Sequence, residues 1–323
     1  LVVAQGARPV IVLPELEQGR VQGSGMDLDI VAYGEDDASR EKAIKKMVDL
    51  VGATALTIAV EPLSLRYYEL ELLRSAAPDW DLHDGGDLFT ALRVHKDPAE
   101  VEKMRAAIRI AEDALDATLP LIKFGMTERE LAAELFVQLL RAGSESEMPF
   151  QPIVASGPNS ALPHSTPTHR QLEPGDLLIL DWGARKDGYI SDITRTFAVG
   201  EVDREYMDIY QIVLEANAAG RSAVRPQATC GAVDQAARQI IQDAGYGDYF
   251  THRTGHGIGL EAHEPPYIRA GDAQELEAGM TFTVEPGIYV NGKAGVRIED
   301  NVLVTADGVE TLTTLDRALQ VVG

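Results

Sequence analysis

Apolar positions in the first part of the chain form short runs that alternate with segments of helical spacing. The short runs predict strands, and the segments with apolar residues three or four apart predict helices. Alternation of the two is typical of a small α/β domain, predicted here over residues 1–95. The predicted strands cover residues 9–13, 30–33 and 53–60, and the predicted helices cover residues 39–51 and 63–75.

A larger domain, predicted over residues 96–323, opens with a long helix for which Asp97 is the expected N-cap and Pro98 the first residue. A second helix begins with the capping-box spacing of Thr127 and Glu130. Because helices and antiparallel hairpins share this domain, the fold class is α+β. Further helices are predicted at residues 204–224 and 231–244, and strands at residues 153–155, 177–181, 190–197, 281–284 and 296–304.

Composition narrows the class of partner. The 51 acidic residues outnumber the 29 basic ones, and the net charge of -22 disfavours nucleic acid or an anionic membrane as a partner. The single cysteine, Cys230, excludes an internal disulfide framework and fits a reducing compartment. No apolar run reaches the roughly 18 residues that span a bilayer, so a soluble protein is expected. Residues 1–15 predict a β-hairpin rather than a signal peptide.

Two aspartates interrupt the apolar strands around residues 177–197. A two-residue turn at Asp187–Gly188 would pair residue 181 with residue 194, whereas a four-residue loop would pair residue 181 with residue 192. In either register Asp181 and Asp192 point to the same face, roughly 5 to 8 Å apart. Either one of them is protonated or a cation lies between them.

Further candidate ligands occur later in the chain. A glycine-rich segment supplies His256 and His263, an apolar strand ends at Glu285, and GVRIEDN places Arg297 and Glu299 two residues apart. One histidine and four carboxylates form an oxygen-rich set that suits Mn²⁺, Co²⁺ or Zn²⁺ in a two-metal site better than a structural zinc.

Several tempting motifs fail. Residues 287–294 have the spacing of a phosphate-binding loop, but Ala294 stands where a hydroxyl is needed. His263 and Glu264 begin an H-E-x-x-H motif in which Tyr267 replaces the second histidine. The sequence contains neither G-x-S-x-G nor G-x-G-x-x-G, so serine-hydrolase and dinucleotide-binding functions have little support.

Four segments together resemble the metal-site motifs of the pita-bread metallopeptidases, and most of all the Xaa-Pro dipeptidases (prolidases) and aminopeptidase P. The segments are DWGARKDGYISDITRTF, THRTGHGIGLEAHEPP, TFTVEPGIY and GVRIEDN. The resemblance covers nearly the whole chain and implies a pita-bread catalytic domain after a smaller creatinase-like domain. It also implies two divalent metal ions, with manganese favoured and cobalt or zinc as alternatives. The implied ligands are Asp181, Asp192, His256, Glu285 and Glu299, of which Asp192 and Glu299 would contact both ions.

The resemblance also implies the remaining roles. His164 would hydrogen-bond the reacting centre, His263 would stabilise the tetrahedral intermediate, and Glu285 would carry a proton as well as bind metal. His252 and Phe150 would line the proline side of the cleft, and Arg297 would orient the acidic ligands. A water or hydroxide between the metals would attack the carbonyl before a proline nitrogen.

One departure weakens the dipeptidase assignment. Prolidases tend to place a basic residue after the second cleft histidine to hold the dipeptide's C-terminus, whereas here Pro265, Pro266 and Tyr267 follow, with Arg269 slightly later. A cation from the first domain or from a partner subunit is one replacement. The leading hypothesis is a cytoplasmic, homodimeric Xaa-Pro dipeptidase acting on small peptides with proline second. The alternatives are an Xaa-Pro aminopeptidase for longer peptides and a non-catalytic binding protein.

Overall fold

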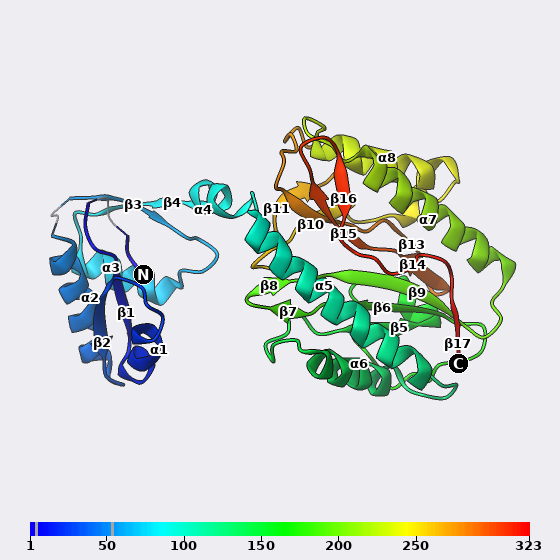
Figure 1. Ribbon diagram of the computed structural model, residues 1–323, viewed down its shortest axis with the longest axis horizontal. Coiled ribbons are helices and arrows are strands. Elements are labelled where there is room, and N and C mark those ends of the chain that lie inside the picture. Colours follow the sequence, from blue (N-terminus) through cyan, green and yellow to red (C-terminus); the bar gives the residue numbers. More distant parts are fainter. Residues whose placement is uncertain (4–5, 53–54) are drawn as a thin grey trace. The chain divides into compact units, whose positions relative to one another are not determined.

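The computed structural model describes residues 1–3, 6–52 and 55–323, which divide into two compact units, Leu1–Ala91 and Leu92–Gly323 (Figure 1). The strand predicted at residues 53–60 begins outside the described residues at 53–54, and its described part is β3 (Thr57–Val60).

The smaller unit contains two pairs of parallel strands with helices between them. Helix α2 packs on the first pair, where Val10, Val31 and Met47 form a buried core. The elements are β1 (Val10–Pro14), α1 (Gln18–Gln22), β2 (Asp29–Tyr33), α2 (Asp37–Val51), β3 (Thr57–Val60), α3 (Tyr67–Ala76), β4 (Asp81–Asp84) and α4 (Gly86–Arg93), which runs past the end of the unit.

The hairpin predicted for residues 1–15 is reduced to one antiparallel bridge between Val2 and Val10. Strand β1 instead pairs in parallel with β2, from Val10 opposite Asp29 to Pro14 opposite Tyr33. Parallel strands need a crossover connection instead of a tight turn, and here the crossover runs through α1. Residues 4–5, within the predicted hairpin, lie outside the described residues.

The larger unit combines four long helices with strands that are antiparallel except for the pairing of β17 with β9. Its helices are α5 (Pro98–Thr118), α6 (Glu128–Ala142), α7 (Arg204–Ala223) and α8 (Cys230–Asp243). Its strands are β5 (Ile153–Ser156), β6 (Leu177–Trp182), β7 (Arg185–Lys186), β8 (Tyr189–Ile190), β9 (Ile193–Val199), β10 (Gly255–Gly257), β11 (Glu264–Ile268), β12 (Thr281–Val284), β13 (Gly287–Val290), β14 (Ala294–Arg297), β15 (Asp300–Val304), β16 (Val309–Thr311) and β17 (Val321–Val322).

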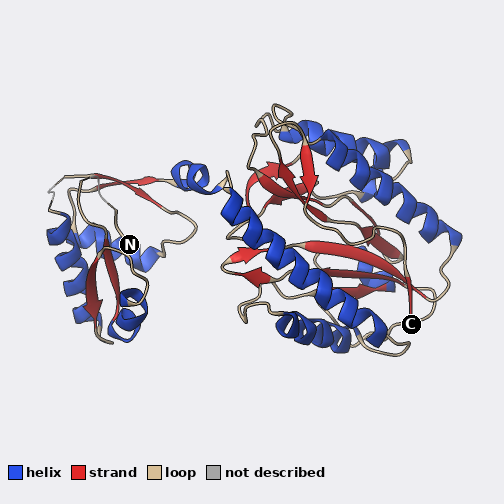
Figure 2. Cartoon of the chain, viewed as in Figure 1, coloured by secondary structure: helices blue, strands red, loops and turns tan. Residues whose placement is uncertain are grey.

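Helices cover the strands from the outside in two similar halves (Figure 2). Helices α5 and α6 bury Ile108 and Leu135 against β6 and β9. Helices α7 and α8 pack on the other half, where Val213 contributes to the core beside β13 and β14. Asp97 is the N-cap of α5 as expected, and it also forms a capping box with Glu100. The capping box expected at Thr127 is present. No described helix is both long enough and apolar enough to cross a membrane.

Candidate metal centre and substrate cavity

The hairpin from β6 to β9 keeps one register throughout, the one set by the two-residue turn. Lys186 pairs with Tyr189, and Asp181 pairs with Thr194. The two turn residues, Asp187 and Gly188, have φ angles of 50° and 81°, which a tight hairpin turn of this type requires. Asp192 is therefore the diagonal neighbour of Asp181, and both side chains line one cavity.

Two of the candidate ligands lie where the predicted strands break. The strand expected over residues 190–197 is interrupted between β8 and β9, at Asp192, and the one expected over residues 296–304 is interrupted between β14 and β15, at Glu299. At each break the chain passes from one sheet to another, an effect of tertiary pairing that apolar spacing does not encode. Asn301, two residues after Glu299, links the two interrupted segments by hydrogen bonds. Its amide donates to the carbonyl of Asp192, and its Oδ1 accepts from the Asp192 N–H at 3.3 Å.

His256 is held with one ring nitrogen facing the acidic residues. It lies in β10 between Gly255 and Gly257, where an added Cβ would come within 1.8 and 2.2 Å of backbone oxygens on neighbouring strands. Its Nδ1 is 3.1 Å from the carbonyl of Gly257, and because a carbonyl only accepts, Nδ1 carries the proton. Nε2 is then a lone-pair donor, 3.6 Å from Asp192 Oδ2 and 3.4 Å from Glu285 Oε1.

The acidic residues carry an excess of buried negative charge. Burial raises the pKa of Asp192 well above its ordinary value, and the charges of Glu299 and Asp181 raise it further. The pKa of Glu299 is likewise raised, by burial and then by Glu285 and Asp181. Burial raises the pKa of Glu285 to about 7 even though Arg297 opposes the shift. Burial and His263 lower the pKa of His256 to about 3, so this imidazole is neutral.

Arg297 compensates only part of this charge. Its Nη2 is 2.6 Å from Asp181 Oδ2, its Nε donates to Thr194 Oγ1 and its Nη1 donates to the hydroxyl of Tyr289. The other oxygen of Asp181, Oδ1, is buried with no hydrogen-bond partner. An unpartnered buried carboxylate oxygen is costly, and a cation bound there would remove the cost.

The donor set fits a divalent metal ion. Ligand atoms of Asp192, His256 and Glu299 all lie within 4.8 Å of one another, and all three residues are buried. Asp181 and Glu285 line the same cavity and supply the unpartnered oxygen and the carboxylate nearest His256 Nε2. Four carboxylates with one neutral imidazole suit manganese, cobalt or zinc rather than a softer ion.

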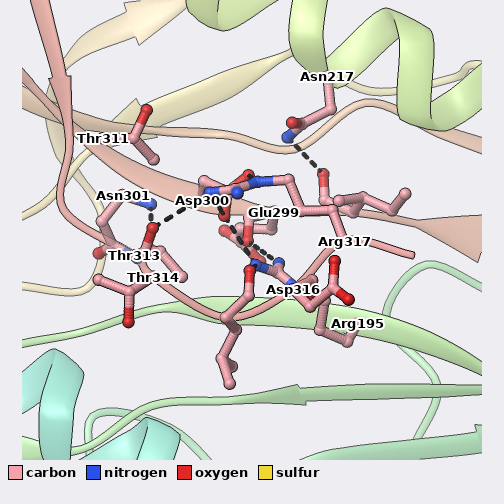
Figure 3. A network of polar contacts seen from close by, with 12 residues as sticks. Arg195, Asn217, Glu299, Asp300, Asn301, Thr311, Thr313, Thr314, Asp316 and Arg317 are labelled. Carbon is pink, nitrogen blue, oxygen red and sulfur yellow. Dashed lines mark hydrogen bonds and ion pairs between the residues drawn. The ribbon is translucent and has the colours of Figure 1, made fainter. Parts of the chain in front are cut away.

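A network of charged side chains around Asp300 fixes the backbone at Glu299 (Figure 3). Asp300 is fully buried and pairs with Arg195 at 2.8 Å and with Arg317 at 2.7 Å. Arg195 in turn donates from Nη1 to the carbonyls of Glu299, at 2.6 Å, and Thr194, at 2.9 Å. Sequence analysis missed this network, although a charged Arg195 inside the apolar strand β9 is a signal that could have revealed it.

The remaining predicted residues line the same cavity, which has a volume of about 470 Å³. The rings of His256 and His263 lie 4.1 Å apart, and the pKa of His263 is lowered by burial and by Arg253. His252 Nε2 lies 2.9 Å from the Tyr289 hydroxyl, and burial and Arg297 lower the pKa of His252 to about 3. The predicted residues that the structure brings to this cavity are Phe150, His164, Asp181, Asp192, His252, His256, His263, Glu285, Arg297 and Glu299.

Four lining residues were not predicted. Gln151 and Pro163 adjoin the predicted residues Phe150 and His164, and Ile153 lies three residues after Phe150. The residue types of these three alone give no signal of a site. Arg253 is the fourth, and its place between His252 and the glycine-rich segment was the available clue.

Comparison with known proteins identifies the family. A model described as metallopeptidase family M24 matches residues 102–306, which is more than half of the chain. The chain belongs to metallopeptidase family M24. Membership in M24 implies divalent metal ions, consistent with the buried group of Asp192, His256 and Glu299.

Individual known proteins are similar to this chain over nearly its whole length. The chain is 36% identical to the Xaa-Pro dipeptidase of Lactobacillus helveticus over 323 residues, covering 100% of this chain and 88% of the relative. The structure of the Xaa-Pro dipeptidase from Bacillus anthracis matches with a TM-score of 0.90 at 35% identity, covering 99% and 88% of the two chains. An X-Pro aminopeptidase from Thermotoga maritima matches with a TM-score of 0.88 at 35% identity, covering 99% and 89%. The pita-bread fold expected for the larger unit agrees with these matches.

Proposed function

We propose that this chain is a metal-dependent Xaa-Pro dipeptidase, which hydrolyses the peptide bond before the proline of a dipeptide. The observation that carries the proposal is that four carboxylates and one neutral imidazole line the same cavity. Three of the carboxylates have raised pKa values, and the fourth has a buried oxygen without a hydrogen-bond partner. The Xaa-Pro dipeptidases of Lactobacillus helveticus and Bacillus anthracis, similar over 99% or more of this chain, support the substrate class.

The proposed metal ligands are Asp181, Asp192, His256, Glu285 and Glu299. When bound, two divalent ions would offset the carboxylate charge and supply a water acidic enough to be a nucleophile at neutral pH. Manganese is the proposed ion, because an oxygen-rich set with one imidazole suits it. Arg297 would hold Asp181 in place through the 2.6 Å ion pair, leaving Oδ1 for a metal.

The other polar groups of the cavity act on the peptide itself. His263 would donate a hydrogen bond to the oxyanion that forms at the scissile carbonyl, with His164 beside the same reacting centre. Glu285, which lines the cavity with Oε1 3.4 Å from His256 Nε2, would pass a proton to the proline nitrogen as the bond breaks. Phe150 and His252 would form the surface against the proline ring.

A substrate series tests the proposal. Chelator-treated protein is reloaded with Mn²⁺, Co²⁺ or Zn²⁺ in turn, and release of proline from Ala-Pro is measured beside cleavage of Ala-Pro-Ala and Ala-Ala. Cleavage of Ala-Pro in preference to the other two is the expected result. Faster cleavage of Ala-Pro-Ala would replace the dipeptidase assignment with an Xaa-Pro aminopeptidase, the activity that the similar Thermotoga maritima protein is named for.

Assembly forms part of the same proposal. We expect a cytoplasmic homodimer, and light scattering of the purified chain measures its oligomeric state directly. A protein that binds no divalent metal and cleaves none of the three peptides would instead be a non-catalytic member of the fold.

A further inference from the structure

Arg253 lines the substrate cavity and forms no ion pair with a described carboxylate. Two guanidinium groups line the described cavity, those of Arg253 and Arg297. Arg297 is buried and occupied by Asp181, Thr194 and Tyr289. Among the described residues, no carboxylate lies within ion-pair distance of Arg253 and no hydrogen bond from its guanidinium is found. Its charge is therefore available to a ligand.

The backbone around Arg253 is fixed from both sides by α8. Arg238 donates to the carbonyl of His252 at 2.8 Å, immediately before Arg253. Asp234 accepts from the Thr254 hydroxyl at 2.8 Å and from its N–H at 3.2 Å, immediately after Arg253. Asp234 and Arg238 also form a two-point ion pair with each other at 2.8 and 2.9 Å. The Arg253 side chain thus starts from a rigid position.

An aromatic ring supports the guanidinium of Arg253 without neutralising it. The guanidinium carbon lies 4.7 Å from the centre of the Tyr267 ring, in β11. Stacking on an aromatic face restricts an arginine side chain while leaving its N–H groups free to bind a carboxylate. Arg253 and Tyr267 are both half-buried, so this cation faces the cavity with only part of its hydration.

We propose that Arg253 binds the free C-terminal carboxylate of the dipeptide and so selects dipeptides over longer peptides. The assignment rests on the proposed function, because a dipeptidase substrate ends one residue, about 3.8 Å, beyond its scissile bond. The group that binds this carboxylate must therefore belong to the same cavity as the reacting groups. A guanidinium meets a carboxylate with two parallel hydrogen bonds, which gives the pair directional strength.

Selectivity follows from the charge of the chain end. In a tripeptide the same carbon belongs to a neutral amide, which cannot form the ion pair and has one oxygen instead of two. Binding such a substrate would partly dehydrate Arg253 without a partner for it, and a site built for a charged group discriminates strongly against an analogue that lacks it. Arg253 would thus take the role left open by the absence of a basic residue among the three residues that follow Glu264.

The test compares two substrates that differ only in this carboxylate, Ala-Pro and Ala-Pro-amide. For Arg253→Ala in the metal-loaded protein, we expect kcat/KM on Ala-Pro to fall about 100-fold, mainly through KM. On Ala-Pro-amide we expect a change of less than about threefold. Arg253→Lys should recover part of the loss, since it keeps the charge but not the two-point geometry.

Matched controls separate this role from a structural one. Arg269→Ala removes one arginine from the end of the same segment, where Arg269 is exposed and paired with Asp272, and should leave both substrates unchanged. Tyr267→Phe keeps the ring and should behave as the unaltered chain, whereas Tyr267→Ala should weaken Ala-Pro selectively.

Equal losses on the two substrates, or an unchanged preference in Arg253→Ala, would overturn the assignment while leaving the dipeptidase function standing. An unaltered chain that cleaves neither substrate with any of the three metals would instead remove the proposed function, and the assignment with it.

Discussion

At the scale of single residues, the site is defined by carboxylates that the protein alone does not compensate. Burial raises the pKa of Asp192 well above its ordinary value, and the charges of Glu299 and Asp181 raise it further. Replacement by asparagine removes one charge at almost the same volume. We therefore predict that Asp192→Asn leaves the metal-free chain as stable as the unaltered one or more stable. It should lose the rise in Tm on adding Mn²⁺, and at least 100-fold of its Ala-Pro activity.

Calorimetry with and without Mn²⁺ measures both thermal effects. A metal-free Asp192→Asn chain that melts several degrees lower, or one that keeps the full Mn²⁺-dependent rise, would contradict this account of the charge.

Glu285 gives a pH dependence of known sign. Its pKa is raised to about 7 in the folded chain, from an ordinary value near 4.5. The stability associated with its protonated form is complete below the unfolded pKa and is lost as pH rises through about 7. With chelator present, the unaltered chain should lose more stability between pH 5 and pH 8 than Glu285→Gln does. Urea titrations across this range measure the difference, and equal slopes for the two chains would argue against a raised pKa.

At the scale of elements, the site depends on strands that stop. Asp192 lies between β8 and β9, and Glu299 lies between β14 and β15. In a continuous strand, successive side chains would point alternately toward and away from the cavity. The network of Asp300 with Arg195 and Arg317 holds the second break. It binds the backbone of Glu299 and not its carboxylate, which stays available to a metal.

Asp300→Asn should therefore damage both the fold and the metal site. It leaves Arg195 buried without its carboxylate, at a cost of about 3 kcal/mol or more in the free energy of unfolding at neutral pH. Burial raises the pKa of Asp300, but Arg195 and Arg317 lower it below its ordinary value overall. Its contribution is present above the unfolded pKa, near 4, and is lost as pH falls further, so the two chains should converge in acid.

Glu205→Gln is the control for Asp300→Asn, because it breaks the exposed ion pair with Lys293, which should contribute less than about 1 kcal/mol. Urea unfolding of the three chains gives the comparison. A cost for Asp300→Asn no larger than the control's would show that the network does not support Glu299.

At the scale of the whole molecule, the sequence was informative where chemistry interrupts an apolar run. Asp181, Asp192 and Glu285 stand out because a charge in a buried strand is costly without a partner. The two-residue turn at Asp187–Gly188 also predicted the register of the hairpin. These local signals, with the resemblance in four motifs, were enough for the fold of the larger unit and for the family.

Features that depend on distant pairing could not be predicted. Apolar spacing continues through Glu299, so it does not reveal that the chain changes sheets there. Apart from the carbonyl of the adjacent Thr194, the partners of Arg195 lie more than 100 residues away in the sequence. Arg253 has no acidic residue next to it in the sequence. Only the folded structure shows that no described carboxylate lies within ion-pair distance of its guanidinium.

The proposed function depends on a two-metal peptidase centre, and one titration tests for that centre. Mn²⁺ is added to chelator-stripped protein while Ala-Pro hydrolysis is followed. We predict no hydrolysis without metal and a rate that saturates at two ions per chain. Hydrolysis that persists after stripping, or none at any Mn²⁺ concentration although the protein is folded, would contradict the claim.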